Sequence, residues 1–401
     1  MTVASVPDEP TIDPFGLAGF GVDDLVDRPG IKWRRPGDRL AAWVADMDFP
    51  IAPAIVEQVR ARVETDAGYP DWPDIARSPL PERFAERMSE RYDWSLDATR
   101  LHEVNDVMQG VEVAIHHLTE PGDGVVLHTP SYPPFLAAIE RADRRLIDVP
   151  ARSTPTGQQW DYDELDRRLS AAGVGPGRAR VWLLCHPHNP TGRVFTPSEL
   201  ERIAELADTY DLVVISDEIH AELVHQPNGH TPFAALGVEV AARTVTVTSS
   251  SKAFNLAGMR WAIMHAGVDR LQQQLDRLPV HYLGAPNLLA VVATDAAWTD
   301  GDAWQRAVLG QLDANRALLG RLLHDHLPDV DYRTPEATYL AWLDCRRLDL
   351  GDDPSVAFRD RGVELSPGPN FGALGAGFAR LNFATSPVVL EAVVRRMADV
   401  R

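Results

Sequence analysis

The chain of 401 residues is 45% hydrophobic and 24% charged, which is ordinary for a globular protein. Its formal net charge of −19 at pH 7 argues against nucleic acid or an anionic membrane surface as a partner. Two cysteines, Cys185 and Cys345, give no disulfide framework and favour a reducing, cytoplasmic location. The acidic N-terminus does not resemble a signal peptide, and no apolar run is long enough to span a membrane.

Residues 1–50 are irregular and rich in Pro, Gly and Asp. Apolar residues then recur at helical spacing, which predicts amphipathic helices over Ile55–Val63 and Glu82–Tyr92. Between these helices, the segment Gly68–Pro73 is typical of a turn-rich loop, and it contains Tyr69.

From Leu101 onward, strand-like apolar runs alternate with helical segments over Val111–Leu118 and Pro197–Thr209. The predicted strands are Val125–His128, Val181–Cys185, Asp211–Ile215 and Thr244–Thr248. Because several of these runs are apolar throughout, they favour a mostly parallel sheet covered by helices on both faces. Ligands bind such sheets at the carboxyl ends of the strands, so the side chains that directly follow each run are the informative ones.

The C-terminal part has a different pattern, with predicted helices over Trp304–His326 and Val388–Met397. Thr338–Leu343 and Phe378–Phe383 alternate as strands do. We therefore predict an α/β protein with a large domain over residues 51–285 and a smaller α+β domain over residues 286–401. The N-terminal segment, residues 1–50, is expected to join the smaller domain.

Lys252 is the first candidate for covalent chemistry. It follows the predicted strand Thr244–Thr248 within a Ser-rich segment, and only Lys32 and Lys252 are lysines among the 39 Lys and Arg residues. An ion pair at the surface can use Arg equally well, whereas a lysine amine can lose its proton and attack a carbonyl. The alternative is a surface lysine after a Ser-rich turn.

Three more side chains follow apolar runs and suit ligand binding. Tyr132 could stack on a planar ring, or it could be a turn tyrosine between prolines. The amide of Asn189, in an Asn-Pro-Thr-Gly turn, could donate to a ligand oxygen. Asp217 ends a buried strand, where a carboxylate is costly unless a cationic ligand nitrogen or a neighbouring arginine pairs with it.

Two positions suit anions. Gly110 directly precedes the predicted helix Val111–Leu118, where free backbone N–H groups favour a phosphate, although a glycine at a helix start is common. Arg380 lies within an apolar strand, and its planar guanidinium suits a substrate carboxylate. The alternative for Arg380 is a structural salt bridge.

Two short motifs point to other chemistry and carry little weight. Ser249 and Lys252 have the spacing found in serine β-lactamases, but the partner motifs of that family are absent. His220, Glu222 and His225 do not have the His-Glu-x-x-His spacing of zinc enzymes, and the two cysteines lie too far apart in the sequence for a zinc deaminase. No metal site is therefore predicted.

In their order along the chain, these motifs resemble the fold-type I pyridoxal-phosphate (PLP) enzymes of the class I and II aminotransferase family. The resemblance runs from near Gly30 to the end of the chain. Three positions depart from it, because His186 replaces a common Asn, and Met108 and Gln109 replace the usual residues before the glycine. Five segments are similar to the branch of carbon–sulfur β-lyases that includes the MalY and PatB types: Trp43–Pro50, Pro187–Val194, Ile215–His220, Ser251–Gly258 and Arg380–Thr385.

The resemblance implies PLP as the cofactor and a role for each candidate residue. Lys252 would carry the cofactor as a Schiff base and move the proton of the substrate Cα, while Asp217 would pair with the ring nitrogen. Asn189 and His220 would contact the ring oxygen, and Tyr132 would stack on the ring. The phosphate would be contacted by Gly110, Val111, Ser249, Ser251 and Arg260, and also by Tyr69 of a neighbouring subunit. The substrate α-carboxylate would be contacted by Arg380, Ala45 and Asp46.

The implied activity is cleavage of a cysteine S-conjugate, cystathionine or another thioether, to a thiol, pyruvate and ammonia, in a homodimer with shared active sites. An aminotransferase, or another reaction at Cα in a biosynthetic pathway, would use the same lysine, so these residues alone do not separate the two activities. A third possibility is a PLP-dependent regulator that binds a protein partner, which no sequence feature favours. The expected partner is a small molecule, with no nucleic acid and no membrane.

Overall fold

A computed structural model describes residues 13–72, 77–154, 157–172, 177–279 and 281–400 of the chain. The first twelve residues of the expected N-terminal segment lie outside this range, whereas every candidate site residue lies within it. No helix in the described part of the chain is long and apolar enough to cross a membrane.

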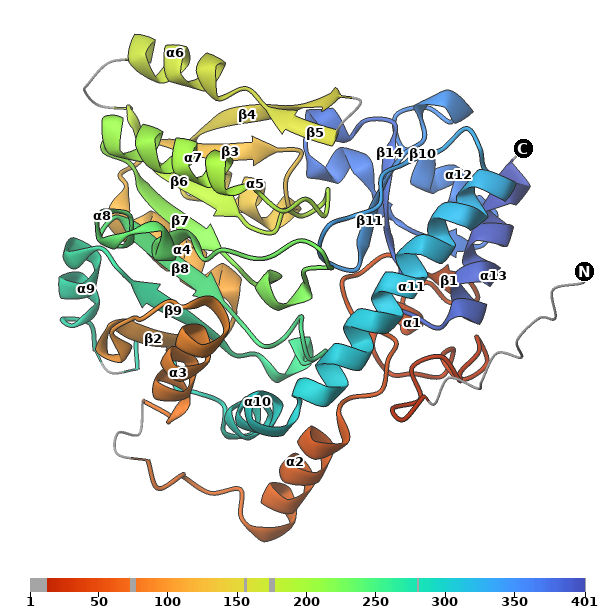
Figure 1. Ribbon diagram of the computed structural model, residues 1–401, viewed down its shortest axis with the longest axis horizontal. Helices are drawn as coiled ribbons and strands as arrows, with labels where there is room; N and C mark the ends of the chain where they lie inside the picture. Colours follow the sequence, from red (N-terminus) through yellow and green to blue (C-terminus); the bar gives the residue numbers. More distant parts are fainter. Residues whose placement is uncertain (1–12, 73–76, 155–156, 173–176, 280, 401) are drawn as a thin grey trace, which may run out of the picture.

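The large sheet has eight strands among the described residues, in the order β2-β9-β8-β7-β6-β3-β4-β5 (Figure 1). Strands β8, β7, β6, β3 and β4 run parallel, while β9 and β5 run antiparallel to their neighbours. The predicted mostly parallel sheet is therefore confirmed. The strands are β2 (Leu101–Val104), β3 (Gly124–Thr129), β4 (Arg145–Thr154), β5 (Gly157–Trp160), β6 (Ala179–Cys185), β7 (Val213–Asp217), β8 (Thr244–Thr248) and β9 (Ala262–Ala266).

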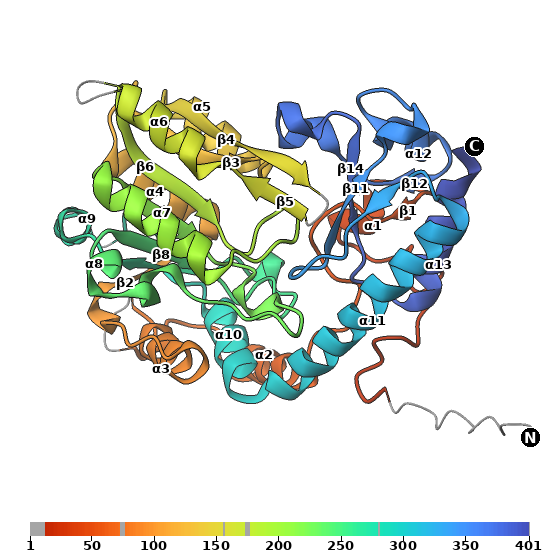
Figure 2. The ribbon, with the colours of Figure 1, turned by 45° about the horizontal axis from the view of Figure 1, so that its top comes forward.

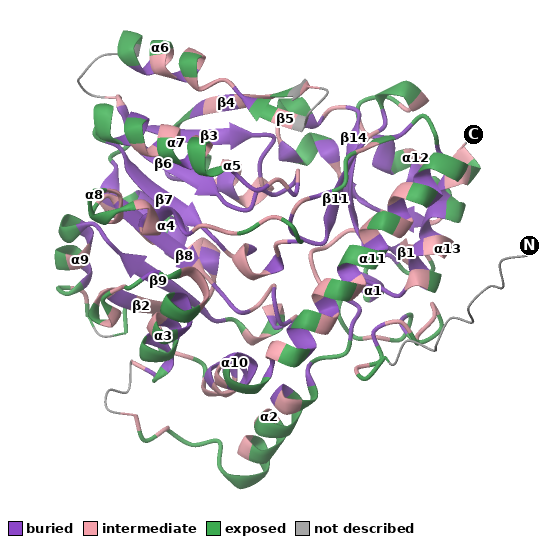
Figure 3. Ribbon diagram, viewed as in Figure 1, coloured by how far each residue is buried: buried purple, intermediate pink, exposed green. Residues whose placement is uncertain are grey.

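Helices cover both faces of this sheet because neighbouring side chains of each strand point to opposite faces. In β6, Val181 and Leu183 pack with one set of helices, whereas Trp182 and Leu184 pack with the other set. All four side chains are fully buried, and the central strands are buried along their length (Figure 3). The first set is α4 (Val107–Leu118), α5 (Pro133–Arg141) and α9 (Asp269–Leu275), and the second is α6 (Tyr162–Ala172) and α7 (Pro197–Thr209).

The C-terminal part contains a four-stranded antiparallel sheet in the order β10-β11-β14-β13. In Figure 2 it lies apart from the large sheet, and α11 (Asp302–His326) runs from beside α10 (Leu288–Asp300) to beside α13 (Pro387–Met397). The strands are β10 (Asp331–Tyr332), β11 (Leu340–Asp344), β13 (Ser366–Pro367) and β14 (Phe378–Asn382), with α12 (Pro354–Asp360) beside them.

The N-terminal segment associates with this C-terminal part through a short parallel pair. Strand β1 (Leu40–Ala41) pairs with β12 (Val363–Glu364), and α1 (Ile31–Arg34) lies just before it. Helix α2 (Pro53–Thr65) then packs against α10, and α3 (Leu80–Tyr92) packs against α10 as well. The domain boundaries after residues 50 and 285 stay a prediction.

Several elements differ from the sequence expectation. Helix α4 begins at Val107 rather than Val111, and β7 begins at Val213 rather than Asp211, while it ends at Asp217 as expected for that carboxylate. Strands β2, β4, β5 and β9 and helices α5 and α6 were not predicted. Strand β4 contains Asp148, Pro150 and Arg152, which interrupt the apolar pattern, and its pairing with β3 and β5 overrides that local sequence.

Candidate functional site

A cavity of about 160 Å³, hereafter the catalytic cavity, lies at the carboxyl ends of β6, β7 and β8. Most of the side chains predicted from the strand ends meet there, which is where ligands bind in parallel sheets. Nine expected site residues line this cavity: Ala45, Tyr132, Asn189, Asp217, His220, Ser249, Ser251, Lys252 and Arg260.

Lys252 is the lysine that faces the catalytic cavity. Its Nζ donates to the backbone oxygen of Ala45 at 2.8 Å, and burial lowers the pKa of its amine. The other lysine, Lys32, has a structural role, because its Nζ lies 2.9 Å from Oδ2 of Asp48 and both side chains are buried. Only one of the two lysines is therefore placed to attack a bound carbonyl.

Asp217 is a buried carboxylate without an ion-pair partner among the described residues. It is 4% exposed, and Oδ1 accepts from the backbone N–H of Ile219 at 3.0 Å. Burial raises the pKa of Asp217 to about 7. No arginine pairs with it within the described ranges, so the alternative of a structural ion pair fails. The carboxylate faces the cavity and suits a cationic ligand nitrogen.

Arg380 is a buried cation that makes no salt bridge to any described carboxylate. Its Nη1 donates to Oδ1 of Asn189 at 2.9 Å, and its Nη2 donates to the backbone oxygen of Trp43 and to Oγ of Ser366, both at 3.2 Å. Its Nε is buried and has no partner among the described residues. Burial lowers the pKa of Arg380 to about 10. An unpaired guanidinium donor in this position suits a substrate carboxylate.

His220 and Tyr132 complete the wall around the lysine. His220 is 2% exposed, and burial lowers its pKa to about 3, so the ring is neutral. Its ring lies edge-on to Tyr339, with centroids 6.3 Å apart, and the hydroxyl of Tyr339 donates to the same Ala45 oxygen as Lys252 does, at 2.8 Å. Burial also raises the pKa of Tyr132, whose phenol therefore keeps its proton.

The N-terminus of α4 forms the anion-binding end of the cavity. Asp106 caps this helix by accepting from the backbone N–H of Gln109, and its other oxygen pairs with Arg260. Val107 and Met108 occupy the first two helical positions and line the cavity, where their N–H groups have no helical acceptor. These groups and Arg260 suit a phosphate.

Two serines extend this end of the cavity. The hydroxyl of Ser249 donates to the backbone oxygen of Trp261 at 2.6 Å and accepts from the backbone N–H of Ser251 at 3.1 Å. This contact fixes the turn that carries Lys252 after β8. The hydroxyl of Ser249 has no hydrogen bond to Lys252, which removes the support for a serine β-lactamase arrangement.

The expectation for Gly110 and Val111 is corrected. They are the fourth and fifth residues of α4, and the N–H of Gly110 donates to the backbone oxygen of Asp106 within the helix. Neither residue lines the catalytic cavity. Gly110 instead allows α4 to approach the sheet closely, because a Cβ there would lie 2.8 Å from Cγ1 of the buried Val247.

Asp46 and Tyr69 also differ from the other expected residues, because neither lines the catalytic cavity. The N–H of Asp46 donates to the backbone oxygen of Val44, and its own backbone oxygen accepts from Lys32 and Asn382, so Asp46 offers no free donor for a carboxylate. Tyr69 is 88% exposed and lies outside the site of its own chain.

His186 lies on the opposite side of β6 from the cavity. Cys185 lines the cavity next to Asp217, whereas the ring of His186 stacks on His230 with centroids 4.6 Å apart. The unusual His186 therefore does not shape the cavity wall directly. Among the described residues no group of three or more His, Cys, Asp and Glu side chains could hold a metal ion, and the ring of His225 bonds the backbone oxygen of Thr338.

Sequence reasoning missed several residues of this site, among them Asp106, Val107, Met108, Cys185, Tyr339 and Ser366. Asp106 carried a signal, because it stands three residues before Gln109 as a helix cap does. Tyr339 and Ser366 carried none, since their contacts with the distant segment Trp43–Ala45 exist only in the folded chain.

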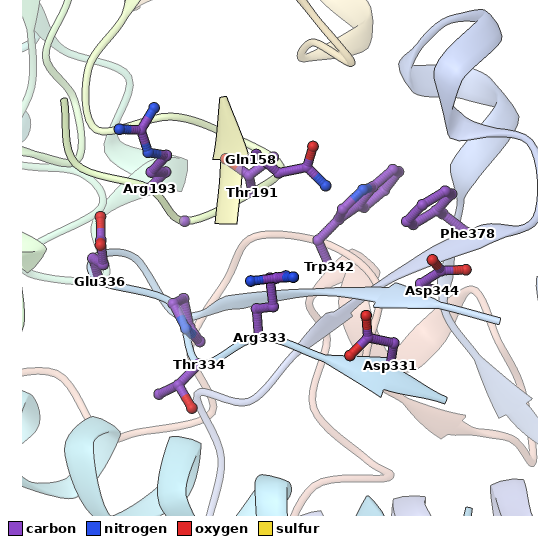
Figure 4. A pocket seen from close by; sticks show the side chains of 12 residues that line it. Gln158, Thr191, Arg193, Asp331, Arg333, Thr334, Glu336, Trp342, Asp344 and Phe378 are labelled. Atoms are coloured by element: carbon purple, nitrogen blue, oxygen red, sulfur yellow. The ribbon is translucent and has the colours of Figure 1, made fainter. Parts of the chain in front are cut away.

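Figure 4 shows a different cavity, of about 190 Å³, between the two sheets. Trp342 of β11 and Phe378 of β14 stack there with centroids 5.1 Å apart, opposite Gln158 and Arg193. The cavity contains no lysine, cysteine or histidine among its lining residues. Its described lining therefore offers no amine that could bind a carbonyl cofactor covalently.

Comparison with known proteins gives a consistent set of matches. The family described as aminotransferase class I and II matches residues 46–397. A Mycobacterium tuberculosis protein named "Putative cystathionine beta-lyase" is 38% identical, over 92% of this chain and 94% of that protein. The cystathionine beta-lyase PatB of Bacillus subtilis is 32% identical, over 94% of this chain and 97% of that enzyme.

A solved structure is similar as well. The PLP-bound C-S lyase of Staphylococcus hominis superimposes with a TM-score of 0.85 at 26% sequence identity. The match covers 95% of this chain and 98% of that chain. The similarity therefore includes both sheets and the segments that form the catalytic cavity.

Proposed function

Because the chain belongs to the class I and II aminotransferase family, we propose that it is a PLP-dependent carbon–sulfur β-lyase that cleaves a cysteine S-conjugate. The observation that carries the proposal is the meeting of three groups in one small region. These are the amine of Lys252 and the unpaired carboxylate of Asp217, which line the catalytic cavity, and the guanidinium of Arg380, which donates to Asn189 of that cavity and has an unpaired donor.

The residues that line the catalytic cavity fit PLP. Lys252 would bind the cofactor covalently, and the buried carboxylate of Asp217 would pair with the ring nitrogen, which explains why no described cation neutralises it. Asn189 and His220 would face the ring oxygen, and Tyr132 would stack on the ring. The phosphate would be held by Ser249, Ser251, Arg260 and the N–H groups of Val107 and Met108.

When bound, PLP supplies an electron sink for the negative charge that develops at the substrate Cα. The chain's own residues control the proton. Burial lowers the pKa of the Lys252 amine, so a larger fraction of it is neutral and able to remove the Cα proton. The hydrogen bond to the oxygen of Ala45 fixes the position of that amine. Asp217 keeps negative charge beside the ring nitrogen and so favours its protonated form.

Arg380 would orient the substrate by binding its α-carboxylate. The buried Nε has no other partner among the described residues, and Asn189, Trp43 and Ser366 hold the two Nη atoms in place. With the carboxylate fixed there, the Cα proton would lie toward the Lys252 side of the cavity. The overall reaction converts R–S–CH₂–CH(NH₃⁺)–COO⁻ and one water into R–SH, pyruvate and NH₄⁺.

The experiment is to incubate the PLP-loaded protein with cystathionine and a series of S-alkyl cysteines. Equal amounts of thiol and pyruvate are expected from at least one compound. The alternative, an aminotransferase, would leave the cofactor in its amine form when no keto acid is present, and an added keto acid would take up the amine and restore the aldehyde form. Absence of thiol and pyruvate from every compound would contradict the lyase proposal.

A homodimer with shared active sites is part of the proposal. Val56 and Val63 of α2 are exposed and, with Ile51 just before the helix and the half-buried Met259, form an apolar surface that supports burial against a second copy. Tyr69, exposed in its own chain, would then reach the phosphate of the partner's cofactor. Mixed dimers of Tyr69→Phe and Lys252→Ala chains test this, because only a shared site allows one fully intact site to form in such a dimer.

A cytoplasmic location is likewise proposed. Cys185 and Cys345 are buried free thiols with no disulfide, which suits a reducing compartment. Fractionation of the producing cells, with activity measured in each fraction, tests the location.

A further inference from the structure

A third and larger cavity, hereafter the distal cavity, lies beside the catalytic cavity. It measures about 420 Å³ and is bounded by the N-terminal segment, α12 and the strands β12 and β13. Tyr132 lines both cavities, and Arg380 lines the distal cavity while it contacts Asn189 of the catalytic cavity. A substrate held at Arg380 can therefore extend into the distal cavity.

The distal cavity is strongly cationic. Its charged lining residues are Arg35, Arg39, Arg359 and Arg380, with Glu364 as the one acidic residue among the described lining. The whole chain carries a formal charge of −19, so this concentration of arginines differs from the average surface. A positive, partly enclosed site attracts anionic ligands.

Glu364 does not neutralise these arginines. Its carboxylate lies 3.0 Å from Arg39 and 3.2 Å from Arg359, so one negative charge is shared by two guanidinium groups. Arg35 has no carboxylate within salt-bridge distance in the described part of the chain, and its guanidinium lies 5.4 Å from the ring centroid of Trp43. The distal cavity thus has surplus positive charge even without Arg380.

We propose that the distal cavity binds a carboxylate at the far end of the leaving thiol, so that the enzyme selects thioethers with an acidic leaving group. The inference rests on the proposed lyase function. Arg380 would hold the α-carboxylate at the inner end of the substrate, and Arg35, Arg39 and Arg359 would bind the distal carboxylate. A carboxylate matches the planar fork of a guanidinium, and two or three arginines can surround it.

The test compares two compounds of nearly equal shape, S-(2-carboxyethyl)-L-cysteine and its amide, S-(2-carbamoylethyl)-L-cysteine. They differ in one negative charge at the end of the leaving group. The PLP-loaded wild-type protein is expected to prefer the acid by roughly tenfold in kcat/KM at low salt, and the preference should shrink as salt screens the exposed arginines. A ratio near one would overturn the proposal.

Three variants test the source of this preference. Arg35→Gln should lower the acid-to-amide ratio by about threefold, because it removes an unpaired positive charge. Glu364→Gln should raise the ratio, because it releases Arg39 and Arg359 from their shared carboxylate. Arg395→Gln is the matched control, since this exposed arginine on α13 pairs with Glu391 outside both cavities and should keep the wild-type ratio.

The signs of the changes in the acid-to-amide ratio decide whether the arginines of the distal cavity bind the leaving group or only stabilise the fold. Changes of the same sign in Arg35→Gln and Glu364→Gln would mean that the arginines only stabilise the fold, and would overturn the proposal. If neither compound is cleaved, the lyase function fails. In that case, calorimetry of the same two compounds with the wild-type protein still tests the distal cavity. Tighter binding of the acid than of the amide would support its selectivity, and equal affinities would overturn it.

Discussion

The two walls of the proposed active site are built in different ways. The wall from the large sheet lines the catalytic cavity and carries Asn189, Asp217 and Lys252, each of which closely follows or ends a strand. The opposite wall lines the distal cavity and brings together Trp43 and Arg380, which are 337 residues apart in the sequence. The comparison teaches that the ends of parallel strands fix the groups of the chemistry, whereas substrate binding depends on contacts between distant segments.

The largest expected effect tests the first wall. Lys252→Ala should lower thiol and pyruvate formation by at least about 10²–10⁴-fold, because the variant loses the base that moves the Cα proton. Product formation measured on the loaded protein checks this. Lys32→Arg is the matched control, since it keeps the charge that pairs with Asp48 and should leave the reaction in place. A shared loss in both variants would argue that Lys252 is structural.

Asp217→Asn is expected to have the next largest effect. The amide keeps the shape of the side chain but removes the charge that would pair with the ring nitrogen. Loss of one partner from a buried pair costs about 3–5 kcal/mol, and the loss should appear in kcat/KM. Asp208→Asn is a control, since it removes a charge in an exposed pair with Arg243. Full activity in Asp217→Asn would contradict the proposal that the carboxylate of Asp217 pairs with the ring nitrogen of the cofactor.

Arg380→Lys tests the opposite wall. Lysine keeps the positive charge but loses the fork that holds Asn189, Trp43 and Ser366. We expect kcat/KM for a thioether substrate to fall by an amount that corresponds to about 2–5 kcal/mol of lost transition-state binding. Cofactor loading, measured by the visible spectrum, should remain. An unchanged kcat/KM would mean that Arg380 has a structural role.

A smaller effect concerns the stability of the protein without cofactor. The folded-state pKa of Asp217, about 7, lies above its ordinary value of 3.8, so folding favours its protonated form. The resulting stability is fully present below pH 3.8 and is lost as pH rises through 7. Between these values the slope should be about −1.4 kcal/mol per pH unit from this group.

Denaturant unfolding at several pH values measures that slope. The difference between the wild-type protein and Asp217→Asn isolates the contribution of this carboxylate from the other titrating groups. A cationic ligand at Asp217 stabilises the charged form, so PLP should reduce the slope. If the free energy of unfolding depends on pH in the same way in the two cofactor-free proteins, the carboxylate of Asp217 is not buried without a partner.

The same comparison explains how far the sequence predicts this protein. The strand that precedes Lys252 and the helix Pro197–Thr209 have the predicted bounds, because local apolar periodicity and a capping box determine them. The prediction failed at the start of α4, where Gly110 suggested a phosphate loop. Gly110 is in fact a packing position against Val247, and Asp106 is the cap.

The second wall could be predicted only in part. Arg380 was recognisable as a charge inside an apolar strand, but its partners Trp43 and Ser366 were not. The distal cavity was not foreseen either, because Arg35, Arg39 and Arg359 are ordinary arginines in a chain that uses arginine almost throughout. The pairing of β1 with β12 brings these segments together, along with the hydrogen bonds of Ser366 and Arg380 to the backbone oxygen of Trp43.

The most direct test of the account is borohydride reduction of the PLP-loaded protein, followed by mass spectrometry of its peptides. Reduction makes the bond between the cofactor and its lysine permanent, and the chain contains only two lysines. The account predicts one modified residue, Lys252, with Lys32 unchanged in its pair with Asp48. Modification of Lys32, or no modified lysine in a protein that still releases thiol and pyruvate, would contradict it.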